Sequence, residues 1–122
     1  MVSTNSSPAS NNLVFGRRLK ESRLGKGLAQ DKLGVLIGID EHSASARISR
    51  YENGIHEPPL KIAKLIADAL NVPLAFLFCE DDKIAQIILS ISKLSDHQLD
   101  QLNIQIGEIK VNLNSLEFIK KV

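Results

Sequence analysis

The segment Gly38–Gly54, GIDEHSASARISRYENG, contains the residues of this chain whose types and spacing favour binding chemistry most clearly. Arg47 and Arg50 are three positions apart, so a helix through the segment would place both guanidinium groups on one face. A second basic group lies upstream, where Lys and Arg outnumber Asp and Glu. Its members are Arg17, Arg18, Lys20, Arg23, Lys26 and Lys32, against Glu21 and Asp31. In a chain of net charge +1, this distribution indicates one modestly basic end that suits a polyanionic partner.

The sequence contains no comparable pattern of residues for catalysis or for metal binding. No nucleophile–base set and no phosphate-binding loop is present, so the chain is not expected to be an enzyme. His42, His56 and His97 lack a cysteine or carboxylate cluster at ligand spacing, which predicts surface histidines, no metal and no cofactor. The single Cys79 excludes an internal disulfide and fits a reducing, cytoplasmic compartment. No run of about 18 apolar residues occurs, so a membrane is not an expected partner.

The apolar spacing predicts the elements that position these groups. Up to about residue 80 it predicts five short helices and no strand. The first runs from about Leu13 to Gly25, the second stops near Gly38, the third lies within Gly38–Gly54, and two more follow Pro58–Pro59. Residues 1–12 are small and polar and are expected to form a disordered arm.

Residues 80–122 are predicted to form a helical extension. Apolar residues there fall at alternating spacings of three and four, which is the pattern of a short heptad seam: Leu99, Leu102, Ile106, Ile109, Leu113 and Leu116. Residues 104–113 also alternate, so a hairpin about Gly107–Glu108 is an alternative. The seam extends on both sides of this stretch and favours the helix. Either packing within the chain or contact between two copies would bury it.

Several of these stretches together resemble one known family. They are LKESR, the GLAQ-x-x-L pattern at Gly27–Leu33, Gly38, ISRYENG at Ile48–Gly54, and PPLKIAKLIADALNVPLAFLF. Over about half the chain the sequence is similar to the Cro/XRE-type (lambda-repressor-like) helix-turn-helix family. The resemblance implies an all-α fold, with a five-helix DNA-binding domain at residues 13–79 and a C-terminal helical extension at 80–122 that is a candidate dimerisation element. It also implies that the third helix enters the major groove of double-stranded DNA.

The resemblance assigns roles to individual positions. Ser45, Ala46, Arg47 and Arg50 occupy groove-facing positions, where an arginine can donate two parallel hydrogen bonds to guanine. Gln30 begins the second helix beside free backbone N–H groups and is a candidate phosphate contact. The further phosphate candidates are Arg17, Lys20, Ser49 and Asn53. Arg23 and Glu52 are expected to form a partly buried ion pair between the first and third helices.

One stretch departs from the family pattern. Between Gly38 and Ile48 the chain has about four extra residues, which is about one helical turn. Either Asp40 caps a longer third helix, or Ser43 caps it after a longer connection. The first alternative is favoured because EHSASAR contains no helix breaker. Glu41 or His42 is then a candidate base contact, with Glu41 accepting from cytosine N4.

These inferences together predict a cytoplasmic, sequence-specific DNA-binding regulator. We expect a repressor that binds a near-palindromic operator as a homodimer through the helix at 41–53. The alternative is an antitoxin or a protein-interaction (coregulator) module that uses the same helix-turn-helix domain.

Overall fold

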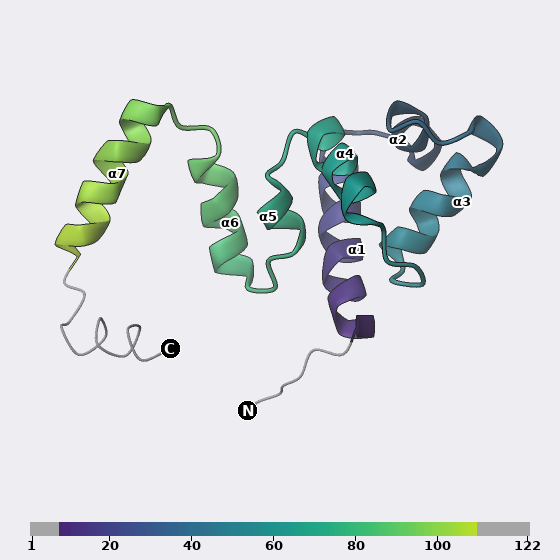
Figure 1. Ribbon diagram of the computed structural model, residues 1–122, viewed down its shortest axis with the longest axis horizontal. Coiled ribbons are helices and arrows are strands. Elements are labelled where there is room, and N and C mark those ends of the chain that lie inside the picture. The colour runs from purple at the N-terminus through teal and green to yellow at the C-terminus, as the bar shows by residue number, and fades with distance from the viewer. Residues whose placement is uncertain (1–7, 110–122) are drawn as a thin grey trace. The chain divides into compact units, whose positions relative to one another are not determined.

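The computed structural model describes residues 8–109, which form helices joined by turns and contain no strand (Figure 1). The helices are α1 (Pro8–Gly25), α2 (Gln30–Leu36), α3 (Glu41–Glu52), α4 (Leu60–Leu70), α5 (Leu74–Leu77), α6 (Asp82–Ile91) and α7 (Asp96–Glu108). The all-α fold and the five helices before residue 80 are therefore confirmed. None of these helices is both long and apolar enough to cross a membrane.

The first helix begins earlier than the sequence predicts. The expected disordered arm of residues 1–12 is too long, because residues 8–12 belong to α1. Pro8 is the first helical residue, and proline suits that position because its φ is fixed near the helical value and its missing N–H is not needed there.

The core of the first compact unit combines side chains from six helices. A boundary between Ser92 and Lys93 separates this unit from the one that contains α7. In Figure 1, α2 and α3 lie on one side of α1, and α5 and α6 lie on the other. The largest fully buried side chains come from α1 to α5: Phe15, Leu19, Leu33, Ile48, Ile66, Leu70 and Leu77. Burial of this apolar surface fixes where α3 sits on the domain.

Two glycines allow α3 to pack closely against its neighbours. A Cβ atom built on Gly16 of α1 would collide with the carbonyl oxygens of Tyr51 and Glu52, the first at 2.6 Å. A Cβ atom on Gly34 of α2 would lie 2.5 Å from Cβ of Ala44. Gly16 and Gly34 therefore set the distances from α3 to α1 and to α2.

The sequence places a domain boundary between residues 79 and 80, whereas the first compact unit of the structure extends to Ser92, because α6 packs on it. Ala85 of α6 is fully buried in the core. Arg18 of α1, which is 2% exposed, donates to the carbonyl oxygen of Cys79 at 2.9 Å and to the Asp82 carboxylate at 2.9 Å. Its guanidinium also lies 5.5 Å from the centre of the Phe76 ring. A buried arginine needs such partners, and they hold the start of α6 against α1.

This contact gives stability a predicted pH dependence. Hydrogen bonds from Arg17 and then Arg18 hold the pKa of the Asp82 carboxyl below its ordinary value. A carboxyl with a lowered pKa in the folded state stabilises the fold above its unfolded pKa, and this contribution is lost as pH falls through the folded pKa. We expect Asp82→Asn to lower the midpoint of thermal unfolding at pH 7, with a difference from the native chain that shrinks below about pH 4.

The matched control is Asp81→Asn. Asp81 caps α6 by accepting from the backbone N–H of Ile84, a role that asparagine fills equally well. Its unfolding midpoint should stay near that of the native chain. A difference between the Asp82→Asn variant and the native chain that is the same at pH 7 and pH 3 would contradict the ion-pair explanation.

The last described helix, α7, begins at Asp96. Ser95 caps it and forms a capping box with Gln98. Gly107 and Glu108 are helical, so the hairpin alternative does not hold for residues 104–108. The helix nevertheless covers only the first part of the predicted seam, because α7 ends at Glu108 and the backbone of Ile109 is extended. Gly107 weakens this last turn. The seam positions Leu113 and Leu116 lie outside the described residues.

Candidate nucleic-acid interface

The third helix starts one turn before the family pattern places its start. Asp40 is the N-cap, and its carboxylate accepts a hydrogen bond of 3.1 Å from the backbone N–H of His42. Gly38, with a φ of +91°, ends the preceding helix. Of the two alternatives, the structure therefore has the longer helix rather than the longer connection.

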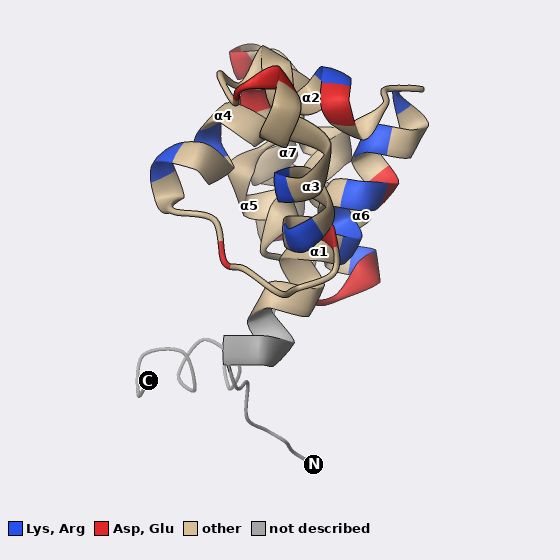
Figure 2. Ribbon diagram, turned by 90° about the vertical axis from the view of Figure 1, so that its right-hand side faces the viewer, with Lys and Arg blue, Asp and Glu red and all other residues tan. Residues whose placement is uncertain are grey.

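The inner side of α3 is defined by four buried residues: Ala44, Ile48, Tyr51 and Glu52. The predicted base-facing residues are all exposed: Glu41, His42, Ser45, Ala46, Arg47 and Arg50. Since an α-helix turns about 100° per residue, Ala46 and Arg50 lie opposite the buried side, while Ser45 and Arg47 lie on its two flanks. Figure 2 faces α3 and shows Lys and Arg positions (blue) along its ribbon. The helix thus presents a polar and basic surface to solvent.

The two arginines of α3 differ in their contacts. Arg47 donates a hydrogen bond of 3.3 Å to the hydroxyl of Tyr51. Arg50 has no carboxylate within ion-pair distance among residues 8–109. Its charge is therefore available to an external anion.

A buried ion pair holds the end of α3 against α1. Arg23, predicted to pair with Glu52, donates to that carboxylate through two guanidinium nitrogens, one of them at 3.2 Å. Both residues are buried, at 7% and 8% exposure. A third nitrogen of Arg23 donates to the carbonyl oxygen of Leu28, 2.8 Å away, which fixes the connection between α1 and α2. The pair therefore fixes both the position of α3 and the start of α2.

Gln30, predicted to contact a phosphate, is part of this network. Its Nε2 donates to Glu52 at 3.0 Å, and its Oε1 accepts from the Ser45 hydroxyl at 3.2 Å. Because a carboxylate only accepts, the amide orientation of Gln30 is set. The second N–H on Nε2 remains available, and the Ser45 oxygen retains acceptor capacity. This link between Gln30, Ser45 and Glu52 was not predicted from the sequence. There Gln30 and Ser45 were expected to contact only DNA, and Glu52 was expected to contact only Arg23.

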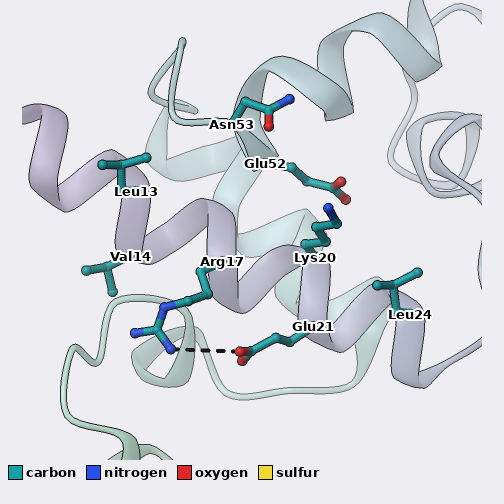
Figure 3. A pocket seen from close by; sticks show the side chains of 8 residues that line it. All are labelled: Leu13, Val14, Arg17, Lys20, Glu21, Leu24, Glu52 and Asn53. Carbon is teal, nitrogen blue, oxygen red and sulfur yellow. Dashed lines mark ion pairs between the residues drawn. The ribbon is translucent and has the colours of Figure 1, made fainter.

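Three of the predicted phosphate contacts line one surface cavity of about 660 Å³ (Figure 3). They are Arg17 and Lys20 of α1 and Asn53 at the end of α3. Arg17 pairs with Asp82 at 3.0 Å and lies 3.8 Å from Glu21, whereas Lys20 has no such partner in the described part of the chain. The Asn53 amide donates to the backbone carbonyl of Ser49 at 2.9 Å and to its hydroxyl at 3.2 Å. Lys20 is therefore the cation of this cavity best placed to meet an anion.

Comparison with known proteins identifies the family. A helix-turn-helix family model matches residues 19–77. The crystal structure of the transcriptional regulator BswR superposes with a TM-score of 0.73 and 39% sequence identity, covering 77% of this chain and 93% of that one. This chain belongs to the Cro/XRE-type helix-turn-helix family. The prophage SPbeta-derived HTH-type transcriptional regulator YonR of Bacillus subtilis (strain 168), itself uncharacterized, is 34% identical over 64 residues. The match covers 52% of this chain and 56% of YonR, so the chain matches about half the length of that relative.

The helix-turn-helix of this family member consists of α2, the turn Ile37–Asp40 and α3. Ile39 in the turn is buried, and its backbone N–H donates to the carbonyl oxygen of Gly34 at 2.9 Å. The turn is therefore part of the core, and α3 is held by packing at its start as well as by the ion pair at its end.

Proposed function

We propose that this chain is a sequence-specific DNA-binding transcriptional regulator of the cytoplasm that places α3 in the major groove. The observation that supports this most strongly is the geometry of α3. Its buried side is fixed by Gly34, Gly16 and the Arg23–Glu52 pair, and its opposite side presents exposed polar and basic residues. A rigid helix with a free polar face is what base recognition in the major groove requires.

The proposed contacts divide by chemistry. Arg47 and Arg50 donate to base edges, Ser45 accepts from or donates to a base, and Ala46 contacts a thymine methyl group. Backbone phosphates are bound by a second set: Gln30, Arg17, Lys20, Ser49 and Asn53. Within that set Arg17 must exchange its partner Asp82 for a phosphate, so we expect it to contribute less than Lys20.

Replacing Arg50 with alanine tests this assignment on the operator. One bidentate arginine–guanine contact contributes about 1–3 kcal/mol, so the affinity for the operator should fall about 5- to 150-fold. The preference at a single base pair in each half-site should disappear. Fluorescence anisotropy against operator variants at several salt concentrations measures both effects.

The control for this variant is Lys64→Ala, which removes an exposed cation from α4 and should leave affinity and preference unchanged. If Arg50→Ala weakens binding equally for all sequences and lowers the salt dependence, Arg50 binds phosphate. An unchanged affinity for the operator contradicts a role for Arg50 in DNA binding.

We further propose that the regulator is a repressor that binds a near-palindromic operator as a homodimer. Two copies of α3 would then lie about 34 Å apart on the duplex. The proposed contact between copies is the seam that begins at Leu99 and Leu102 and continues through Ile106 and Ile109 toward Leu113 and Leu116. In its support, Ile106 and Ile109 are 48% and 68% exposed.

Lysine at positions 106 and 109 tests the dimer. Buried lysines at a contact between copies would be strongly unfavourable, so Ile106→Lys with Ile109→Lys should sediment as a monomer and bind the operator weakly. Gln105→Lys is the control, because it also introduces a lysine into α7 but at a position that is already polar. Should the doubly substituted chain sediment as the native dimer does, the seam is not the interface.

A further inference from the structure

The additional turn at the front of α3 presents two residues that could meet DNA, Glu41 and His42. Both are exposed, and the Asp40 cap fixes the backbone of this turn. The two side chains cannot play the same role, however, because adjacent residues of a helix point in directions about 100° apart.

Glu41 belongs to the side of α3 that faces α2. It lines a surface cavity of about 510 Å³ together with residues of α2 and its flanking connections. The others are Leu28, Asp31, Lys32, Val35, Leu36 and Ile39. Its position in the helix is close to the direction of the buried Ala44 and Ile48. Glu41 therefore lies beside α2, on the exposed edge of the packed side of α3, and not on the face opposite the buried residues.

His42 belongs to the opposite side. Positions 42, 46 and 50 are four residues apart, so His42, Ala46 and Arg50 form one exposed row along α3. That row lies on the far side from the buried residues. Among residues 8–109, the His42 side chain has no hydrogen bond or ion pair. Its imidazole is therefore free to contact an external group.

We infer that His42 is the first base-contacting residue of α3 and lengthens the operator half-site, an inference that rests on the proposed DNA-binding function. One turn adds about 6 Å of helix, which corresponds to roughly two base-pair steps. An imidazole N–H donor matches the N7 acceptor that both purines present in the major groove. His42 thus specifies a purine at the end of the half-site, beyond the base pairs contacted by Ala46 and Arg50.

Glu41 has a different effect on binding. Its carboxylate adds negative charge near the phosphates and contacts no base, so its removal raises affinity for all sequences alike. This assignment differs from the sequence-based hypothesis that Glu41 accepts from cytosine N4.

In-vitro selection of bound DNA from a random library, using the native chain, Glu41→Ala and His42→Ala, tests the inference. Both variants replace an exposed residue in the same turn with a good helix former, so thermal unfolding should confirm that each remains folded. His42→Ala should reduce the preference for a purine at the outermost position about tenfold and keep the preferences at the inner positions. Glu41→Ala should keep every preference and bind more tightly.

The outcomes separate the inference from the proposed function. If the native chain selects a motif whose outermost position changes with Glu41→Ala and not with His42→Ala, the inference is wrong and DNA binding stands. The same holds if neither variant changes that position. If the native chain enriches no motif, the proposed function itself fails.

Discussion

Replacing Glu52 with alanine is expected to destabilise the first unit by about 3–5 kcal/mol, because Arg23 then remains buried without its carboxylate. The loss also leaves Nε2 of Gln30 without the acceptor that sets its orientation. Urea unfolding measures the free energy directly. Since a small domain has a total stability of about 5–15 kcal/mol, the variant should lose a large fraction of its stability.

Two further variants show that the buried charge is the cause. Glu57→Ala removes an exposed glutamate and should change stability by about 0.5 kcal/mol at most. Replacing Arg23 and Glu52 together with leucine should recover much of the loss, because an apolar pair leaves no unpaired charge. If Glu52→Ala lowers the free energy of unfolding by less than about 1 kcal/mol, water must solvate the Arg23 guanidinium or another group must pair with it.

The second large effect is expected at Gly16, where alanine would place a methyl group against the carbonyl oxygens of Tyr51 and Glu52. These are backbone atoms that cannot rotate away, so α1 and α3 must separate. The expected destabilisation is about 3 kcal/mol, at the upper end of the range for overpacked sites. DNA affinity should fall as well, because the end of α3 moves with the contact.

Gly25→Ala is a matched control in the same helix. A Cβ at Gly25 meets no atom within 4 Å, and its φ is not positive. That substitution should be neutral or stabilise the unit by up to about 1 kcal/mol, because alanine is the better helix former. Equal stabilities for the two variants in urea unfolding would show that Gly16 does not determine the packing of α1 on α3.

Much of the first unit could be predicted because local sequence and tertiary packing agree there. The apolar spacing before residue 80 gives the five helices, and Gly38 followed by Asp40 gives the end of α2 and the cap of α3. The Arg23–Glu52 contact came from the family resemblance rather than from spacing. No local pattern connects residues that are 29 positions apart.

The position of α6 could not be predicted from local patterns. Ile84, Ile87, Ile88 and Ile91 form the apolar spacing of this helix, yet Ile84 and Ile87 are exposed at 53% and 58%. The fully buried residue is Ala85, whose small side chain allows a close approach. The helix is attached by hydrogen bonds from Arg18 in the middle of α1, although the sequence groups this charge with the basic residues that suit a polyanionic partner.

The close approach of α3 to its neighbours is a second feature that spacing does not show. A glycine inside a helical pattern, as in VFGRR and KLGVL, indicates that another backbone or side chain comes near. That signal was present at Gly16 and Gly34, but it does not say which element approaches. The orientation of the Gln30 amide likewise cannot be predicted from local sequence, because it depends on two residues of another helix.

The central claim is that α3 recognises a DNA sequence in the major groove. Selection of bound fragments from random double-stranded DNA at low salt tests it most directly, because binding, sequence preference and half-site spacing are measured together. We predict one enriched motif of two inverted half-sites whose centres lie about 10 base pairs apart or at a multiple of that distance. Enrichment of no motif, or a motif unchanged by Arg50→Ala and Arg47→Ala together, would contradict the account.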